Sequence, residues 1–253
     1  VVFDGEDVLT FDEKELQGVR GAKISYIFQE PSTSLNPVFT IGDQIRETVM
    51  LHRGMDKKSA LGFSEGLLET VGMPAPKQRL SAYPHELSGG MKQRVMIAMA
   101  IASGPALLVA DEPTTALDVT IQAQILALLD DLRKTKALSV LLITHDLSIV
   151  GQIADKVAIM YMGRIVEYAP LADIMNNPLH PYTIGLMSCV PKPGEAKERL
   201  VSIKGNVPDA GRIPQGCRFN PRCKLADDSC RKAEPELAEV KPGHFVRCIK
   251  CRC

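Results

Sequence analysis

Two short motifs carry residue types suited to nucleotide chemistry. Ser88-Gly89-Gly90 precedes a helix-forming run, where glycines let backbone N–H groups approach a phosphate and a helix N-terminus adds a favourable partial charge. Asp111-Glu112 directly follows a short apolar run that is typical of a buried strand. Ligands in open α/β sheets gather at such strand ends. We therefore expect Asp111 to contact Mg²⁺ and Glu112 to polarise an attacking water as a general base.

Simpler structural roles exist for both motifs. Ser88 is a common type of helix N-cap, and the two carboxylates could form an exposed acidic turn before Pro113. The full string LSGGMKQR at 87–94 favours the nucleotide interpretation, because a buried helix follows it and the acidic strand end comes soon after. Two adjacent carboxylates directly after four apolar residues favour it as well.

The elements expected around these motifs alternate between strands and helices, which predicts an α/β architecture with a largely parallel sheet. We expect strands at 23–28, 107–110 and 140–144, the last two fully buried, helices at 41–50, 59–71, 91–102 and 119–133, and a hairpin over 157–161 and 164–167. Proline and cysteine become frequent from Pro178. This change predicts a domain boundary near residue 175, followed by a small irregular extension over 176–253.

Composition narrows the class of protein. The 253 residues are 45% hydrophobic and 24% charged, as in an ordinary globular protein, and 30 basic residues balance 30 acidic ones. No net field therefore favours nucleic acid or an anionic membrane surface. No apolar run approaches the roughly 18 residues of a membrane span. Six of the seven cysteines lie between Cys217 and Cys253, and such crowding in a cytosolic protein favours metal binding over disulfides.

Five motifs, in this order, resemble those of ABC-type ATPases. They are Gln29 after a β-rich run, LSGGMKQR at 87–94, the Walker B strand ending in Asp111-Glu112, TTALD at 114–118, and His145 after an apolar strand. The resemblance implies a partial ABC ATPase domain over 1–175, with a P-loop NTPase-like α/β fold and an inserted helical subdomain at about 41–103. In this family two domains pack head to tail, and each ATP lies between one subunit's phosphate loop and the other's signature motif.

The resemblance also implies roles for individual residues. The nucleotide-binding set comprises Ser88, Gly89, Gly90, Gln93 and Asp118. Gln29 would reach the metal and the attacking water, and His145 would hydrogen-bond the γ-phosphate and hold water and base in register. Glu112 would be the base and Asp111 the Mg²⁺ ligand. Taken alone, a histidine or glutamine at a strand end is more often structural, and Asp118 is also a typical N-cap.

The sequence has no G-x-x-x-x-G-K-[ST] loop, although the family places one upstream of Gln29. The lysine that clamps the β- and γ-phosphates and the Ser/Thr that holds Mg²⁺ are therefore missing. We expect an N-terminally truncated chain rather than a naturally degenerate subunit, because the sequence starts at Val1 without an initiator methionine and retains Glu112 and His145. We expect no measurable ATPase activity from this chain unaided.

Four cysteines share a proline-rich segment with little apolar content, in the spacing C-x5-C-x6-C-x17-C: Cys217, Cys223, Cys230 and Cys248. Such a segment cannot build its own core, so a bound metal would stabilise it. Spacing alone makes zinc the default ligand, and unliganded thiols are the alternative. The roles of three further cysteines stay open: Cys189, Cys251 and Cys253.

Two segments resemble the C-terminal extension of oligopeptide/dipeptide-type importer ATPases, namely NPLHPYT at 177–183 and GCRFNPRC at 216–223. In part of that family, four cysteines at this spacing hold a [4Fe–4S] cluster, and thiolates are the expected ligands of such a cluster. The resemblance therefore favours an iron–sulfur cluster over zinc, in a structural role.

The implied protein is the ATP-hydrolysing subunit of a bacterial-type importer of di- or oligopeptides, peripheral on the cytoplasmic face of the membrane. Its partners would be a second ATPase subunit, two membrane permeases that contact the helical region at about 41–84, and indirectly a substrate-binding protein. Nickel or another small solute is the alternative cargo. A non-catalytic subunit that lends LSGGMKQR in trans is a second candidate. A non-transport ABC ATPase for DNA repair or chromosome maintenance is a third, but the sequence has neither the coiled-coil insertion nor the basic surface of that class.

Overall fold

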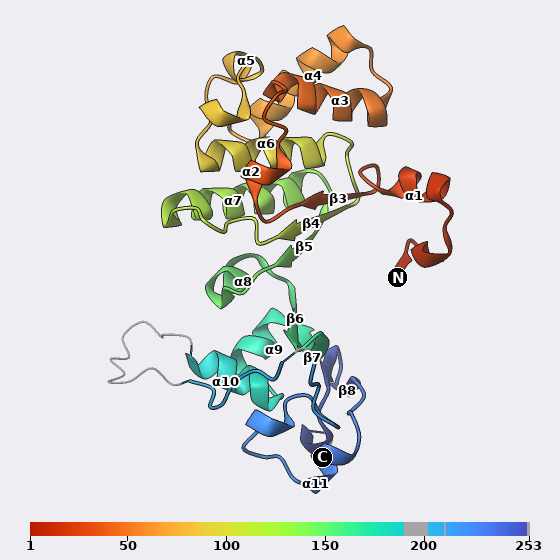
Figure 1. Cartoon of the computed structure of the whole chain (residues 1–253), viewed down its shortest axis with the longest axis vertical. Coiled ribbons are helices and arrows are strands. Elements are labelled where there is room, and N and C mark those ends of the chain that lie inside the picture. The colour runs from red at the N-terminus through yellow and green to blue at the C-terminus, as the bar shows by residue number, and fades with distance from the viewer. Residues whose placement is uncertain (190–201, 210, 252–253) are drawn as a thin grey trace. The chain divides into compact units, whose positions relative to one another are not determined.

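The computed structural model describes residues 1–189, 202–209 and 211–251 and forms two compact units, Val1–His145 and Asp146–Cys253 (Figure 1). The domain boundary expected near residue 175 stays a prediction, because it rests on a change of sequence character rather than on contacts. Cys253 lies outside the described residues, so the open question about its role stays open.

A three-stranded parallel sheet organises the first unit and confirms the expected α/β architecture. Its strands, in the order β3-β4-β5, are β3 (Ile24–Ile27), β4 (Leu107–Asp111) and β5 (Ser139–Ile143). Asp111 pairs with Ile143 at the end of β4. Because the strands are parallel, the residues that follow each of them meet at one edge of the sheet. A short antiparallel pair, β1 (Val2–Phe3) and β2 (Glu6–Asp7), precedes them.

Helices pack on this sheet and form a helical region beside it. They are α1 (Glu13–Val19), α2 (Pro31–Ser34), α3 (Ile41–Arg53), α4 (Lys57–Thr70), α5 (Pro76–Arg79), α6 (Gly89–Ile101) and α7 (Val119–Thr135). In Figure 1, α6 and α7 lie along the sheet, and α3 and α4 lie on the far side of α6. Helix α3 is capped by Thr40 at its N-terminus and by Gly54 at its C-terminus, where the φ of 64° is a left-handed conformation that glycine adopts without strain. The helices expected from periodicity are therefore present.

The prediction that 107–110 and 140–144 are strands buried on both faces is wrong for the described part of this unit. Leu108 and Ala110 on β4 are fully buried, and the strands on either side of β4 contact helices, β3 with α6 and β5 with α7. Leu141 and Ile143 on β5 are 52% and 42% exposed. The apolar runs therefore form strands as expected, but the described helices cover only one of the two faces.

A four-stranded antiparallel sheet organises the second unit, in the order β6-β7-β9-β8. The strands are β6 (Lys156–Tyr161), β7 (Arg164–Pro170), β8 (Ala238–Lys241) and β9 (His244–Val246), and the helices are α8 (Leu147–Ile153), α9 (Leu171–Asn176), α10 (Pro181–Cys189) and α11 (Asp228–Lys232). The β6–β7 pair is the expected hairpin around Gly163. The core of the unit is formed by Val157, Ile159, Tyr161, Val166, Ile174 and Phe219.

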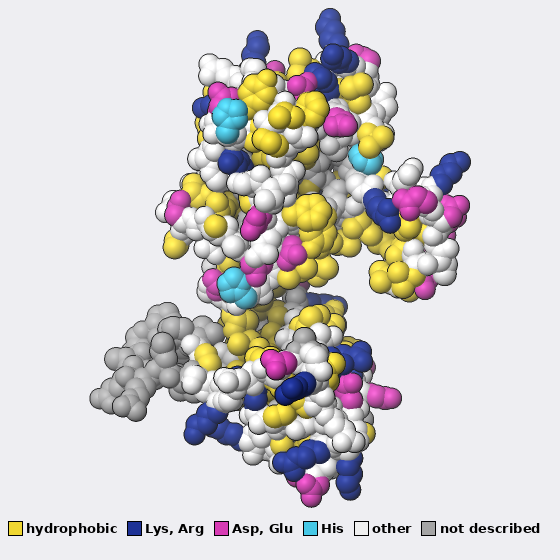
Figure 2. Space-filling model, in the orientation of Figure 1, with side chains coloured by type: hydrophobic (Ala, Val, Ile, Leu, Met, Phe, Trp, Pro, Cys, Tyr) yellow, Lys and Arg dark blue, Asp and Glu magenta, His cyan; other side chains and the backbone are white. Residues whose placement is uncertain are grey.

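The surface of the N-terminal segment is rich in hydrophobic side chains (Figure 2). Val2 and Leu9 are 72% and 75% exposed, so the residues before α1 contribute little to the core. Among the described helices, none has the length and apolar character that crossing a bilayer requires.

Candidate functional site

Glu112 is the centre of a hydrogen-bonded cluster at the carboxyl edge of the parallel sheet. Its Oε1 lies 2.7 Å from Nδ1 of His145. Its Oε2 accepts a hydrogen bond from Nε2 of Gln29 at 2.8 Å, across 83 positions of sequence, and another from Oγ1 of Thr115 at 2.8 Å. The structure thus brings together the three residues expected to be catalytic: Gln29, Glu112 and His145.

The cluster favours the ionised form of Glu112. The hydrogen bond with His145 lowers the pKa of Glu112 most, and those from Thr115 and Gln29 lower it further. The side chain of His145 is 78% exposed and that of Glu112 is 22% exposed. The cluster therefore presents an ionised carboxylate and an imidazole to a ligand approaching from solvent.

Backbone geometry directs the Glu112 side chain. Its N–H donates to the carbonyl of Ile143 at 2.9 Å, which extends the pairing with β5 by one residue. Its φ is 45°, in the left-handed region, where a non-glycine residue is strained by about 1–2 kcal/mol. The carbonyl of Glu112 then accepts from the N–H of Thr115 at 3.1 Å. This sharp turn after β4 places the Thr115 hydroxyl beside the carboxylate of Glu112.

Asp111, the expected Mg²⁺ ligand, is hydrogen-bonded through one of its oxygens. The hydroxyl of Tyr26 on β3 donates to Oδ2 of Asp111 at 2.7 Å, and this bond raises the pKa of Tyr26. Carboxylate and amide oxygens are the ligands that Mg²⁺ prefers, and the ion usually keeps several waters. The donor set of Asp111 and Gln29 is therefore chemically suited to Mg²⁺. Tyr26 was missed from the sequence, because its approach to Asp111 depends on strand register.

Ser88 and the two glycines that follow have distinct structural parts at the start of α6. The Oγ of Ser88 accepts from the N–H of Met91 at 3.4 Å, so the serine is the N-cap, and its hydroxyl hydrogen can still serve another acceptor. A Cβ on Gly90 would lie 2.7 Å from Cγ2 of Ile121 on α7. A Cβ on Gly89 would lie 3.4 Å from Cδ2 of Leu117, which is an ordinary van der Waals contact. Helix packing therefore requires glycine at 90 and not at 89.

Two other members of the expected nucleotide-binding set have structural surroundings. Gln93 is 1% exposed inside α6, and its Nε2 has no hydrogen-bond partner among the described residues. Asp118 is the N-cap of α7 and accepts from the N–H of Ile121 at 2.9 Å. Nucleotide contacts by either residue remain predictions.

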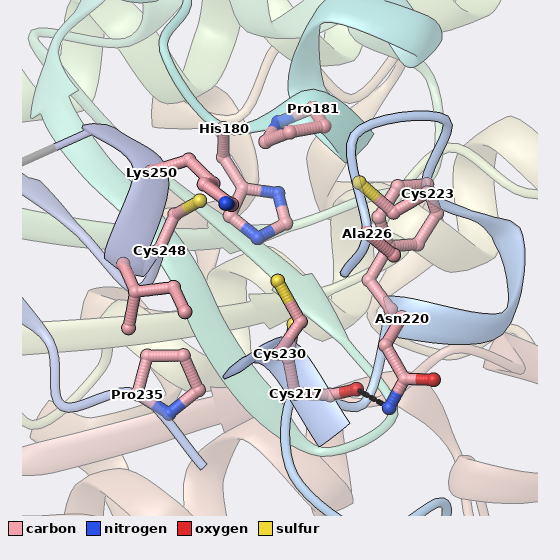
Figure 3. Close-up of a pocket in the computed structure, with 12 residues that line it drawn as sticks. His180, Pro181, Cys217, Asn220, Cys223, Ala226, Cys230, Pro235, Cys248 and Lys250 are labelled. Atoms are coloured by element: carbon pink, nitrogen blue, oxygen red, sulfur yellow. Dashed lines mark hydrogen bonds between the residues drawn. The ribbon is translucent and has the colours of Figure 1, made fainter. Parts of the chain in front are cut away.

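The second unit contains a small cavity lined by all four cysteines expected to bind a metal (Figure 3): Cys217, Cys223, Cys230 and Cys248. Backbone N–H groups favour the thiolate at three of the cysteines, because those of Phe219, Leu225 and Lys250 lower the pKa of Cys217, Cys223 and Cys248 respectively. The thiol of Cys251 lowers the pKa of Cys248 to about 6, whereas burial raises the pKa of Cys217 and Cys223. No group of three or more His, Cys, Asp or Glu side chains in the described ranges is already arranged around a metal position. The thiols share a cavity without converging on one point.

Gly216 fixes the loop that carries Cys217 against α11. Its φ is 74°, and a Cβ there would lie 2.3 Å from the carbonyl oxygen of Cys230. The N–H of Cys217 donates to that same oxygen at 2.8 Å. The close backbone approach that glycine allows therefore holds two of the four cysteines in register.

A buried carboxylate, missed from the sequence, lies behind this cavity. Glu167 on β7 is fully buried and accepts from the N–H groups of Leu179 and His180 at 2.7 and 2.9 Å. Nε2 of His244 lies 2.7 Å from its Oε1. His180 lines the cavity and is 1% exposed, and burial lowers its pKa to about 4. The sequence signal that could have indicated this buried carboxylate is NPLHPYT at 177–183, which contains its backbone donors Leu179 and His180.

Each of the two units contains a segment that matches a known protein family. Residues 1–115 match the family model described as ABC transporter, and residues 166–230 match that of the oligopeptide/dipeptide transporter C-terminal region. The oligopeptide transport ATP-binding protein OppD of Salmonella typhimurium is 48% identical over 248 residues, which cover 98% of this chain and 74% of the relative. The chain belongs to the ABC transporter family. AppD of Bacillus subtilis, also named an oligopeptide transport ATP-binding protein, is 49% identical over 249 residues, covering 98% of this chain and 76% of the relative.

Solved ABC cassettes share the fold of this ABC transporter chain. The dimeric cassette MJ0796, in a post-hydrolysis state bound to ADP and Pi, superimposes with a TM-score of 0.59 at 27% identity, covering 67% of this chain and 72% of that one. The structure of cbiO1 from Clostridium perfringens has a TM-score of 0.61 at 24% identity, covering 70% and 67%, and supports the fold alone. The family expected from the five motifs is thus confirmed.

Proposed function

We propose that this chain is the ATP-binding and ATP-hydrolysing subunit that powers import of di- or oligopeptides. The names of its relatives and the match of residues 166–230 to the oligopeptide/dipeptide C-terminal region support this cargo class. The subunit would be peripheral on the cytoplasmic face of the membrane. It would work with two permeases, which contact the helical region of α3 to α5, and indirectly with a substrate-binding protein.

The observation that carries the proposal is the bonding of Glu112 to both Gln29 and His145. Glu112 takes the proton of the attacking water, and its lowered pKa keeps it ready as a base at neutral pH. His145 holds the carboxylate on one side and presents its other ring nitrogen, Nε2, to the terminal phosphate of ATP. Asp111 and the amide oxygen of Gln29 would hold Mg²⁺, which neutralises phosphate charge when bound.

A second ATPase subunit, identical or different, would complete the site. Ser88 donates its hydroxyl hydrogen to the γ-phosphate of the ATP held by that subunit, and the N–H groups of Gly89 and Gly90 approach the same phosphate. Asp118 contacts the neighbour at the dimer interface. The dimeric state of MJ0796 supports this arrangement.

The cysteine cavity is proposed as a structural metal–thiolate centre. Cys217, Cys223, Cys230 and Cys248 would hold a [4Fe–4S] cluster, with Zn²⁺ as the alternative occupant. Support comes from the four cysteines that line one cavity and from the backbone N–H groups that act to lower the pKa of three of them, which favours the thiolate form. The centre would fix the loops of a unit whose described core is small.

A chimera tests the proposed transport function. The region of Salmonella OppD that aligns with this chain is replaced by this chain, and the rest of OppD is kept. In a strain without its own OppD, we expect the chimera to restore oligopeptide-dependent growth, with Glu112→Gln lowering its ATP turnover about 10²–10⁴-fold. A folded chimera that restores nickel uptake but not peptide uptake would overturn the cargo. Full turnover by the Glu112→Gln chimera would overturn the base.

The 253-residue chain by itself is expected to hydrolyse no ATP at a measurable rate, because its sequence contains no phosphate-binding loop. The measurement is phosphate release by the purified chain with Mg²⁺ and ATP. Robust turnover that disappears in Glu112→Gln would contradict this expectation.

A further inference from the structure

The NPLHPYT string contains a histidine whose hydrogen bonds fix its tautomer. His180 is 1% exposed, and its Nδ1 accepts from the backbone N–H of Tyr182 at 3.1 Å. A nitrogen that accepts this bond carries no proton of its own, so the ring proton of His180 must be on Nε2. The tautomer therefore follows from backbone geometry alone.

The Nε2–H of His180 faces the cysteine cavity. The ring lines that cavity together with the four cysteines, and Figure 3 shows it projecting into the same space as the sulfurs of Cys223, Cys230 and Cys248. Within the described ranges of the chain, Nε2 of His180 has no hydrogen-bond partner. Nε2 of His180 is not one of the fully buried unpaired atoms of the described residues, and the ring lines the cavity, so this N–H can donate to a group that occupies the cavity.

The His180 ring is fixed in position by contacts with residues outside the cysteine cluster. The N–H of His180 donates to the buried carboxylate of Glu167, which is also bonded to Leu179 and His244. The ring packs against Phe219, with centroids 5.9 Å apart. Because Nδ1 and the ring face both have fixed partners, the His180 side chain cannot rotate to give Nε2 another acceptor without breaking both contacts.

We propose that His180 donates its Nε2–H to a sulfur of the metal–thiolate centre held by the four cysteines, as a positioning residue and not as a ligand. The inference rests on the metal centre proposed above. Thiolate or inorganic sulfide is the acceptor that the cavity lining offers. A metal ligand would need a free lone pair on Nε2, and the bond from Tyr182 to Nδ1 puts the proton there instead. NPLHPYT and GCRFNPRC, which are separate in the sequence, would then belong to one site.

Metal retention tests the proposal. The full chain is loaded anaerobically with iron and sulfide, and in parallel with Zn²⁺ alone, and metal per chain and the rate of metal loss to a chelator are measured. His180→Leu removes the donor at similar volume, and His180→Gln keeps an N–H donor. We expect His180→Leu to bind the same amount of metal but lose it about 10-fold faster, as typical of a lost outer-shell bond, and His180→Gln to stay closer to the unsubstituted chain. With iron and sulfide, the reduction potential of His180→Leu should be more negative, because a sulfur loses a hydrogen bond.

Thr183→Val is the matched control. Thr183 is fully buried in α10, the helix that begins directly after His180, and does not line the cavity. Equal loss rates for His180→Leu and the unsubstituted chain would overturn the role of His180 while leaving the centre intact, and so would equal acceleration in Thr183→Val. If His180→Leu does not fold, His180→Met takes its place in the same comparison. A chain that binds no metal, or a Cys230→Ser variant with unchanged metal content and loss rate, would overturn the centre itself.

Discussion

Replacing Gly216 by alanine should lower the unfolding free energy of the second unit more than the same replacement at Gly243, a glycine with the same φ. The φ of Gly216 is 74°, which strains an alanine by about 1–2 kcal/mol. The added Cβ would also lie 2.3 Å from the carbonyl oxygen of Cys230 and 2.7 Å from the carbonyl carbon of Arg231. Both atoms are backbone, so neither can swing aside, and overpacking of this kind costs about 1–3 kcal/mol. The expected loss of unfolding free energy is about 2–5 kcal/mol in sum.

Gly243→Ala separates the two contributions. Gly243 has the same φ of 74°, but a Cβ there would meet nothing within 4 Å, so only the backbone strain remains. Urea unfolding followed by circular dichroism and by tyrosine emission gives the free energy of each variant, since the chain has no tryptophan. We expect Gly216→Ala to be less stable than Gly243→Ala by about 1–3 kcal/mol. Equal midpoints and slopes for the two variants would refute the argument that the loop is locked on α11 by close backbone contact.

Three further changes have defined outcomes. Gly90→Ala should destabilise the first unit by about 1–3 kcal/mol in urea unfolding, through overlap with Ile121, while Gly89→Ala should change it little. Thr115→Val should raise the pKa of Glu112, measured by carboxyl NMR titration, and Thr115→Ser should restore it, because the hydroxyl donates to the carboxylate. Thr40→Val should cost about 0.5–2 kcal/mol by removing the N-cap of α3. It should also raise the pKa of Asp43, whose hydrogen bond from Thr40 lowers it most. Folding lowers the pKa of Asp43, so ionised Asp43 stabilises the folded chain above pH 3.8, and this stabilisation is lost as the pH falls through the pKa that Asp43 has in the folded chain. The loss of stability in acid should therefore be smaller in Thr40→Val.

The site was predictable where it depends on strand order. Gln29, Glu112 and His145 each follow an apolar or β-rich run, and parallel strands bring such positions to one edge. Thr115 and Tyr26 were not predictable in the same way. The first reaches Glu112 because the backbone turns through a left-handed residue, and the second reaches Asp111 through strand register. Neither geometry has a signature in hydrophobic periodicity.

Packing partners that are distant in sequence account for the remaining differences. Gly90 belongs to a Ser-Gly-Gly sequence typical of phosphate-binding turns, yet the contact that excludes a larger residue there is with Ile121 on α7. The runs that form β4 and β5 are continuously apolar, and apolarity predicts that a strand will be covered without identifying which segment covers it. Glu167 lies in a strand among apolar residues, and its full burial is explained by partners that are distant in sequence: the backbone donors at Leu179 and His180 and the ring of His244.

The left-handed backbone of Glu112 puts stability and chemistry in opposition at a single position. At a φ of 45°, glycine would relieve the strain that glutamate bears there, so Glu112→Gly should resist heat and urea at least as well as the unsubstituted chain. A laboratory selection that scores thermal tolerance alone would therefore enrich glycine at 112. The same change removes the carboxylate that Gln29, Thr115 and His145 converge on. Engineering this subunit for robustness must accordingly exclude position 112 from the search.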